Sequence, residues 1–137
     1  MNRFAIIDTS IYVDHYRKDS YHKELTEIQY VVRNSSVVIS ELRRGCLTPS
    51  EREAIEDLAG LSPLITPTEN IWLESGRLLS DLAQKKGYSP QKLRDLHFDV
   101  LIALSARTIG AYLITNNHKD FEEIQRMKDF KLIIWNE

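Results

Sequence analysis

Hydrophobic residues are grouped in two ways along the chain, in short continuous runs and in longer segments where they recur every three or four positions. Continuous runs are typical of strands that are buried on both faces of a sheet. Four such runs lie at residues 4–7, 37–39, 112–114 and 131–135. A fifth run, at residues 63–67, begins and ends with proline, which favours a short edge strand or an extended loop.

The periodic segments predict amphipathic helices. We expect these helices at residues 21–34, 48–61, 68–87 and 96–109, around residues 121–127, and as a short turn at residues 42–45. Ser50 and Glu53 form a capping-box pattern near the start of the second helix. Thr68 can cap the third helix, and Gly87 and Gly110 are placed to end the third and fourth.

The alternation of strands and helices predicts the fold class. Strands separated by helices are typical of a parallel sheet with helices on both faces. We therefore expect a three-layer α/β/α domain whose central parallel sheet has four or five strands. The sequence contains no repeat, linker or low-complexity tract, so we expect residues 1–137 to form a single domain.

The composition indicates the class of protein and the cell compartment that suit this domain. With 42% hydrophobic and 28% charged residues, the 137-residue chain is an ordinary globular protein, and no apolar run is long enough to predict a membrane span. The single cysteine, Cys46, excludes an internal disulfide framework and fits a reducing cytoplasm, where we expect the protein to be located. The formal charge of −2 means that a nucleic acid would have to be held by a local basic patch.

Acidic residues stand at informative positions. Asp8 and Glu41 follow predicted strands, Asp120 lies in the first turn of a helix after another strand, and Asp99 lies on a largely apolar helix. The carboxyl ends of parallel strands form a ligand-binding crevice, and a carboxylate in an apolar helix is unfavourable unless a cation or donors meet it. Each acid also has a local interpretation, because Asp8 is a good N-cap, Asp99 suits a polar flank near the first turn, and residues 115–121 can simply begin a helix.

A parallel α/β domain would bring these four acids into one crevice. Four carboxylates in one pocket raise one another's pKa values unless a cation neutralises them. Only oxygen ligands are clustered, which indicates Mg²⁺ or Mn²⁺ rather than zinc. An acidic cleft that holds such a cation suits phosphodiester hydrolysis, because the cation activates water and neutralises charge on the phosphate.

Four short motifs contain these acids. The first is an apolar strand ending in Asp-Thr-Ser, and the second is a Ser-Glu-Leu-x-x-Gly segment. The third is an Asp leading into an Ile-Ala helix, and the fourth is a Thr-x-Asn-x-x-Asp-Phe segment. They lie at residues 7–10, 40–45, 99–103 and 115–121. In kind and order they resemble the motifs of PIN-domain ribonucleases, and in size and motif form the chain resembles the VapC-type toxins of prokaryotic toxin–antitoxin pairs.

The resemblance implies roles for the acids. Asp8 and Asp99 would be direct ligands of Mg²⁺ or Mn²⁺, and Glu41 and Asp120 would complete the cluster directly or through water. The implied activity is a metal-dependent endoribonuclease that hydrolyses RNA phosphodiester bonds, with tRNA among the candidate substrates.

The same resemblance implies supporting residues and partners. Thr115 and Asn117 would orient the ligands or a phosphate oxygen. VapC-type proteins usually form homodimers, and a cognate antitoxin silences them by packing a segment over the toxin. Basic residues near the acids are candidates for an RNA-attracting rim. They are Arg43, Arg44, Lys85, Lys86, Lys92, Arg94 and Lys119.

Other classes fit the sequence less well. A phosphatase with an aspartyl nucleophile would carry an Asp-x-Asp pattern, whereas Ser10 occupies the second position here. The phosphoacceptor Asp and later Lys of a receiver domain are not evident, and the five glycines form no phosphate-binding loop. The alternative that remains open is a catalytically silent PIN-like module that binds RNA or a protein.

Overall fold

Four parallel strands form the centre of the protein. The computed structural model describes residues 3–136, and the strands of this sheet are β1 (Phe4–Ile7), β2 (Val31–Val32), β5 (Tyr112–Thr115) and β6 (Lys131–Ile134). Their order is β2-β1-β5-β6, and the three pairings are all parallel. The predicted α/β fold with a central parallel sheet of four or five strands is confirmed.

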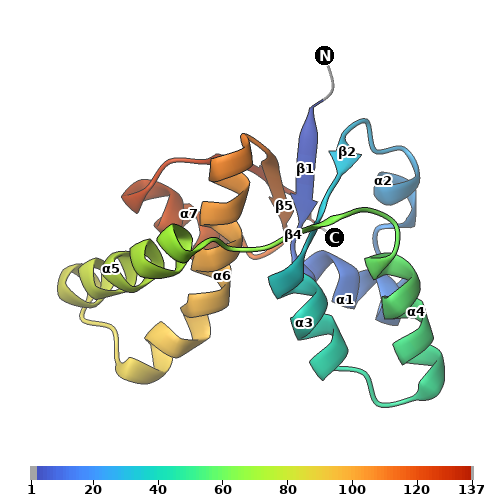
Figure 1. Cartoon of the computed structure of the whole chain (residues 1–137), viewed down its shortest axis with the longest axis horizontal. Helices are drawn as coiled ribbons and strands as arrows, with labels where there is room; N and C mark the ends of the chain where they lie inside the picture. The colour runs from blue at the N-terminus through green and yellow to red at the C-terminus, as the bar shows by residue number, and fades with distance from the viewer. Residues whose placement is uncertain (1–2, 137) are drawn as a thin grey trace.

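Helices lie on both sides of this sheet (Figure 1). The part of the chain that the structure describes forms seven helices: α1 (Thr9–Lys18), α2 (His22–Thr26), α3 (Ser36–Arg44), α4 (Pro49–Ala59), α5 (Glu69–Lys86), α6 (Pro90–Ile109) and α7 (His118–Met127). In Figure 1, α5, α6 and α7 lie to one side of β1 and β5, and the first four helices lie to the other. None of these helices is both long and apolar enough to cross a membrane.

A second, smaller sheet is formed by two short strands. It pairs β3 (Asn34–Ser35) with β4 (Leu64–Ile65) in parallel. The edge strand predicted within residues 63–67 is therefore confirmed, although it covers only two residues.

Helix α6 is the centre of the core. Val100, Leu101 and Ile102 are fully buried, as are Ala5 and Ile6 of the adjacent sheet. Consecutive buried residues point around most of a helix's circumference, so residues 100–106 of α6 are enclosed on nearly all sides. Asp99 comes directly before this segment, and the core therefore desolvates its carboxylate.

The ends of the long helices follow the sequence signals. Thr68 caps α5 by accepting a hydrogen bond from the Ile71 amide, and α5 ends at Gly87, whose φ of 67° is strained for any residue with a side chain. Ser89 caps α6, so this helix begins at Pro90, the start that the sequence Ser89-Pro90 favours, and the helix expected at residues 96–109 is its later part. Proline suits the first turn because its missing amide proton would have no partner there.

The strand expected at residues 37–39 is wrong. These residues lie in α3, whose first turn is capped by Ser35 through hydrogen bonds from the amides of Val37 and Val38. All three residues of the run are buried, because α3 packs against α1, α4 and α6. A short buried helix and a buried strand have the same apolar signature, and here tertiary packing decided between them. Glu41 is consequently on a helix and does not follow a strand.

The helix expected at residues 21–34 is also wrong beyond its first turns. Only α2 is helical there, and Val31 and Val32 instead pair with Phe4 and Ala5 of β1. A β-branched pair suits a strand, and the sheet edge offered it backbone partners.

The capping box at the start of α4 involves other residues than expected. The side chain of Thr48 accepts a hydrogen bond from the Glu51 amide, and the Glu51 carboxylate accepts one from the Thr48 amide. The predicted pair Ser50 and Glu53 is therefore incorrect by two residues.

Candidate active site

Parallel pairing brings the ends of β1 and β5 together at the same edge of the sheet. Ile7 pairs with Ile114, so Asp8, the residue after β1, lies beside Thr115, the last residue of β5. The Asp8 amide donates to the carbonyl of Ile114 over 2.8 Å, which fixes the backbone at this point. The main sheet therefore positions the first acid directly.

Asp8 is both an N-cap and a buried acid. It is 4% exposed, and its Oδ2 accepts hydrogen bonds from the hydroxyls of Ser10 (2.7 Å) and Thr115 (2.8 Å) and from the Ser10 amide. Burial raises the pKa of Asp8, and these hydrogen bonds oppose the rise. The three hydrogen bonds all reach Oδ2 and fix the orientation of the carboxylate.

Glu41 reaches the same region from α3. Its Oε1 accepts a 2.8 Å hydrogen bond from the hydroxyl of Thr9, the residue next to Asp8. Burial raises the pKa of Glu41, and the charge of Asp8 raises it further, whereas the Thr9 hydrogen bond and the charge of Arg44 lower it. Thr9 therefore ties α3 to the end of β1.

The pKa of the Asp99 carboxylate is strongly raised. Burial, followed by the charges of Asp8, Glu41 and Asp120, raises its pKa to about 8, and Lys92 opposes this rise. An effect of all three acids on one carboxylate means that the four lie within the range of strong electrostatic coupling. The structure thus brings the four predicted acids into one region.

Asp120 is held by residues of two elements. Its Oδ1 accepts from Lys92 Nζ of α6 over 3.2 Å, and its Oδ2 accepts from Asn117 Nδ2 over 3.3 Å. The backbone amide of Asn117 in turn donates to the Thr115 hydroxyl over 3.0 Å. Thr115 therefore supports Asp8, and Asn117 links Thr115 to Asp120.

Several supporting residues were not identified as such from the sequence. Thr9 and Ser10 were visible as hydroxyl residues after Asp8, but their partners depend on how α3 and β5 pack. Lys92 was expected only at the rim, whereas it also forms an ion pair with Asp120. Asp95, one turn before Asp99, is exposed and accepts a hydrogen bond from Gln91 over 2.9 Å.

The donor set can be compared with the needs of a cation. Within residues 3–136, no three His, Cys, Asp or Glu side chains are arranged closely enough to form a preassembled metal site. The acids nevertheless present only carboxylate oxygens, which are the ligands of Mg²⁺ and Mn²⁺. Repulsion among the four carboxylates opposes their closer approach, and a bound cation would neutralise that repulsion. The chemistry of the residues therefore fits such an ion.

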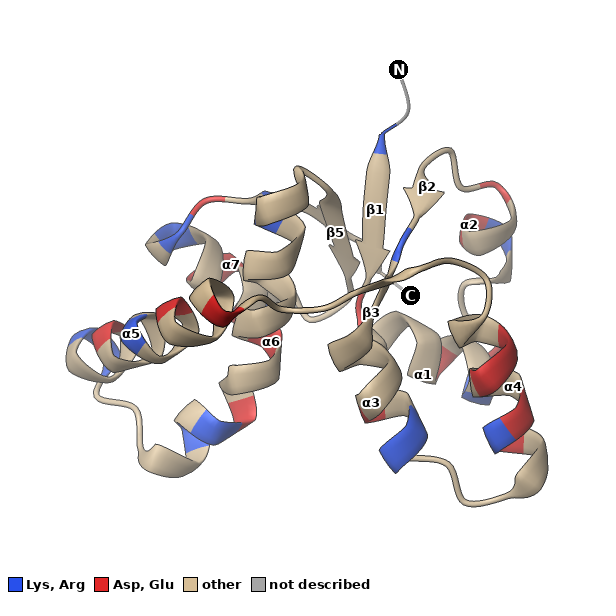
Figure 2. Ribbon diagram, in the orientation of Figure 1, with Lys and Arg blue, Asp and Glu red and all other residues tan. Residues whose placement is uncertain are grey.

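Basic residues flank the acids on two helices. Figure 2 shows blue segments at the end of α3 and near the start of α6, at the same end of the molecule. Arg43 forms a bidentate ion pair with Glu56 at 2.7 Å, and Lys86 pairs with Glu123 at 3.5 Å. Arg44 lowers the pKa of Glu41, so its positive charge acts on the acidic region itself.

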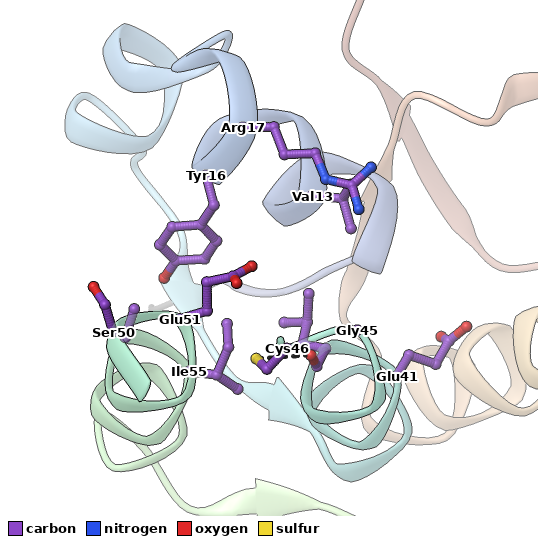
Figure 3. Close-up of a pocket in the computed structure, with 11 residues that line it drawn as sticks. Val13, Tyr16, Arg17, Glu41, Gly45, Cys46, Ser50, Glu51 and Ile55 are labelled. Atoms are coloured by element: carbon purple, nitrogen blue, oxygen red, sulfur yellow. Dashed lines mark hydrogen bonds between the residues drawn. The ribbon is translucent and has the colours of Figure 1, made fainter. Parts of the chain in front are cut away.

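A pocket of about 270 Å³ opens beside Glu41, between α1, α3 and α4. Figure 3 shows Glu41 at one end of this pocket and Ser50 at the other, with Val13 and Ile55 contributing apolar walls. We call it the α1–α3–α4 pocket. Its apolar lining therefore lies next to Glu41, one of the four acids.

Comparisons with known proteins agree with this arrangement. The family model of the PIN domain matches residues 5–127. A VapBC2 structure from Rickettsia felis, bound to a DNA fragment from their promoter, is 26% identical with a TM-score of 0.73, covering 97% of this chain and 99% of that chain.

Two further solved structures show the same fold. DNA-bound VapBC from Salmonella typhimurium is 22% identical with a TM-score of 0.72, covering 99% of this chain and 100% of that chain. VapBC-5 from Mycobacterium tuberculosis, of the VapBC family of toxin–antitoxin systems, is 18% identical with a TM-score of 0.67, covering 96% and 98%. No curated protein matches the sequence.

Proposed function

Because the chain belongs to the PIN-domain family, whose members are generally nucleases, we propose that it is a divalent-metal-dependent endoribonuclease and the toxin of a type II toxin–antitoxin pair. The observation that carries the proposal is the grouping of the four acids around Asp99, whose pKa is raised to about 8 by burial and then by the charges of Asp8, Glu41 and Asp120. Repulsion among buried carboxylates lowers the stability of a fold, so it is not explained by a structural role. Carboxylates with perturbed pKa values in one region are typical of a functional site.

The four acids are the residues that would hold Mg²⁺ or Mn²⁺. Asp8 and Asp99 are the proposed direct ligands, and Glu41 and Asp120 complete the site directly or through water. The bound cation would supply activation of water and neutralisation of charge on the scissile phosphate.

The other residues of the site orient these acids. The Ser10 and Thr115 hydroxyls fix Asp8, Thr9 fixes Glu41, and Asn117 fixes Asp120. Such supporting hydrogen bonds set the direction of each carboxylate before the cation arrives.

The proposed reaction is hydrolysis of one RNA phosphodiester. Water adds to phosphorus, one ester P–O bond breaks, and the departing oxygen receives a proton. Arg44, at the edge of the acids, and the other basic residues of α3 and α6 would attract the RNA backbone, which acids alone would repel.

Chelation is the direct test of metal dependence. We expect the purified protein to cleave a mixed RNA pool that includes tRNA when Mg²⁺ or Mn²⁺ is present, and to lose this activity when EDTA is added. Re-addition of excess Mn²⁺ should restore cleavage, which controls for irreversible unfolding. If intact RNA persists under all conditions while the protein remains folded, the chain is a silent PIN-like binding module.

An antitoxin is the proposed protein partner. The three similar structures described above are of VapBC proteins, one of them from the VapBC family of toxin–antitoxin systems. The α1–α3–α4 pocket offers a site for such a partner, because part of its wall is apolar and it carries both acids, Glu41 and Glu51, and a base, Arg17, that can pair with charged side chains of a bound segment. A segment bound here would lie against Glu41 and so obstruct the acidic region. We also propose that the chain forms a homodimer, because the VapC-type proteins that it resembles usually do.

The partner proposal predicts that filling the pocket blocks binding. Ala54 lines the pocket on α4, whereas its neighbour Glu53 is exposed and does not. We expect Ala54→Trp to weaken binding to the cognate antitoxin by about tenfold or more, equivalent to about 1.4 kcal/mol. Glu53→Trp adds the same side chain one residue away and should bind like the parent. Equal capture by both variants would contradict this binding site.

A further inference from the structure

A second cavity of about 270 Å³ lies on the other side of α3, between α3, α5 and α6. Its lining includes the aromatic rings of Trp72 and Phe98 and the hydroxyl residues Ser36, Ser40 and Thr66. We call these five residues the base pocket. Neither the acids nor the α1–α3–α4 pocket includes any of them.

The base pocket shares two walls with the acidic region. Phe98 directly precedes Asp99 on α6, and Ser40 directly precedes Glu41 on α3. Successive residues of a helix are separated by 100° around the axis and by only about 1.5 Å along it. Each of the two helices therefore presents one residue to the acids and the preceding residue to the base pocket.

Trp72 provides a preorganised aromatic surface. Its side chain is 47% exposed, although it is a large apolar residue. The ring packs edge-to-face against His97, with centroids 5.7 Å apart at an interplanar angle of 78°. His97 is itself held by Ser75, whose buried hydroxyl lies 3.1 Å from Nε2 and donates to the Trp72 carbonyl.

The contacts with Trp72 give a role to two residues that lie outside the acidic site. His97 and Ser75 have no direct role at the acids, yet together they restrict the orientation of Trp72. Restricting an exposed aromatic side chain in advance reduces the conformational entropy that a ligand must remove when it binds.

Phe98, the second aromatic residue of the base pocket, lies close to a cation. The Arg44 guanidinium lies 5.9 Å from the centroid of the Phe98 ring, and Arg44 also acts on the pKa of Glu41. A positive charge thus lies near both the aromatic pocket and Glu41. A phosphate held by Arg44 would allow its nucleoside to enter the pocket while the neighbouring phosphate reaches the acids.

We propose that the base pocket binds one unstacked nucleobase of the RNA substrate beside the scissile phosphate. Trp72 and Phe98 provide stacking surfaces, and the hydroxyls of Ser36, Ser40 and Thr66 provide hydrogen-bonding groups for the base edge. The substrate is accordingly single-stranded RNA or a loop, because a base inside a duplex cannot enter. This inference rests on the proposed ribonuclease function and specifies the form of RNA that the site takes.

Tryptophan fluorescence tests the pocket without requiring cleavage. The sequence has two tryptophans, Trp72 and Trp135, so Trp135→Phe leaves Trp72 as the only tryptophan. In EDTA, a short single-stranded RNA of mixed sequence should quench Trp72 emission as it binds, and the same sequence paired into a duplex should bind about tenfold more weakly. Binding of single-stranded RNA without any change in Trp72 emission would overturn the proposal.

Variants of α5 give the matched comparison. Binding of dye-labelled single-stranded RNA, measured by anisotropy, should weaken about tenfold in Trp72→Ala and stay within about threefold in Trp72→Phe, which keeps an aromatic face. Leu73→Ala removes an exposed apolar side chain that does not line the base pocket, and it should bind RNA like the parent. Equal binding by Trp72→Ala and the parent would overturn the pocket.

Two further measurements separate the failure of this inference from that of the ribonuclease proposal. Metal-dependent cleavage by the parent, with unchanged cleavage and binding by Trp72→Ala, would leave the ribonuclease intact and overturn only the base pocket. Sedimentation of Trp72→Ala should match that of the parent. A change of oligomeric state that accounts for the lost RNA binding would show that Trp72 contacts a second copy of the chain, which also overturns the pocket.

Discussion

Replacing Asp99 with Asn is expected to abolish RNA cleavage and at the same time to stabilise the metal-free protein. Loss of one carboxylate removes a proposed direct ligand, and we expect cleavage to fall more than about 100-fold, because even supporting residues of metal sites contribute 10- to 100-fold. Stability should rise because burial and three neighbouring acids raise the pKa of Asp99 to about 8. Since one pKa unit corresponds to about 1.4 kcal/mol, the free energy of unfolding should increase by roughly 2–4 kcal/mol at pH 7.

The pH dependence of stability gives this prediction a definite sign. Between about pH 4 and pH 8, the folded protein retains the Asp99 proton that the unfolded chain has already released. Unfolding in this range releases a proton, so the parent should lose stability as the pH rises and level off above about pH 8. Urea unfolding in EDTA should show a shallower fall for Asp99→Asn.

Asp95→Asn is the matched control for this experiment. Asp95 lies one turn earlier on α6, is exposed, and contacts Gln91 rather than another acid. It should leave both cleavage and the pH dependence of stability close to those of the parent. If Asp99→Asn were less stable than the parent at pH 7 in EDTA, the proposed repulsion among the acids would be contradicted.

Removal of the Asp8 carboxylate is expected to eliminate stabilisation by a divalent cation. A ligand that binds only the folded state at 100 times its Kd stabilises that state by about 2.7 kcal/mol. Thermal unfolding of the parent should therefore shift upward with Mn²⁺, whereas Asp8→Asn should show little shift. Asparagine preserves the shape of the side chain and can still accept hydrogen bonds from Ser10 and Thr115, so the fold should be retained.

The same titration has a predictable dependence on pH. A cation requires ionised carboxylates, and the pKa of Asp99 near 8 means that binding displaces a proton below that pH. The Mn²⁺-induced shift of the parent should thus be larger at pH 8 than at pH 6. An equal Mn²⁺ shift in Asp8→Asn and the parent would place the cation elsewhere on the protein.

Fold class and long helices could be predicted because local signals and tertiary structure agreed there. The hydrophobic density of residues 100–104 indicated a buried helix, and Ser89 and Pro90 marked its actual start. Residues 37–39 show the limit of this approach. Their buried β-branched side chains fit a strand as well as a helix, and only the Ser35 cap and the packing of α3 decide the outcome.

The four acids were predictable as a set, but their local environments were not. Glu41 was predicted as a site residue because it follows a predicted strand, but it reaches the site from helix α3. Its hydrogen bond with Thr9 connects residues 32 positions apart, and that of Asp8 with Thr115 connects residues 107 positions apart. Such contacts depend on how distant elements pack, which residue spacing within one segment does not encode.

The most direct test of the account is a crystal structure grown with saturating Mn²⁺ and measured for its anomalous signal. The account predicts Mn²⁺ coordinated by carboxylate oxygens of Asp8 and Asp99, with Glu41 and Asp120 binding it directly or through water. Crystals of Asp8→Asn under the same conditions should lose this signal. A fully ordered acidic region without Mn²⁺ in the parent, or Mn²⁺ bound only at other residues, would contradict the claim that these four acids form one cation-binding centre.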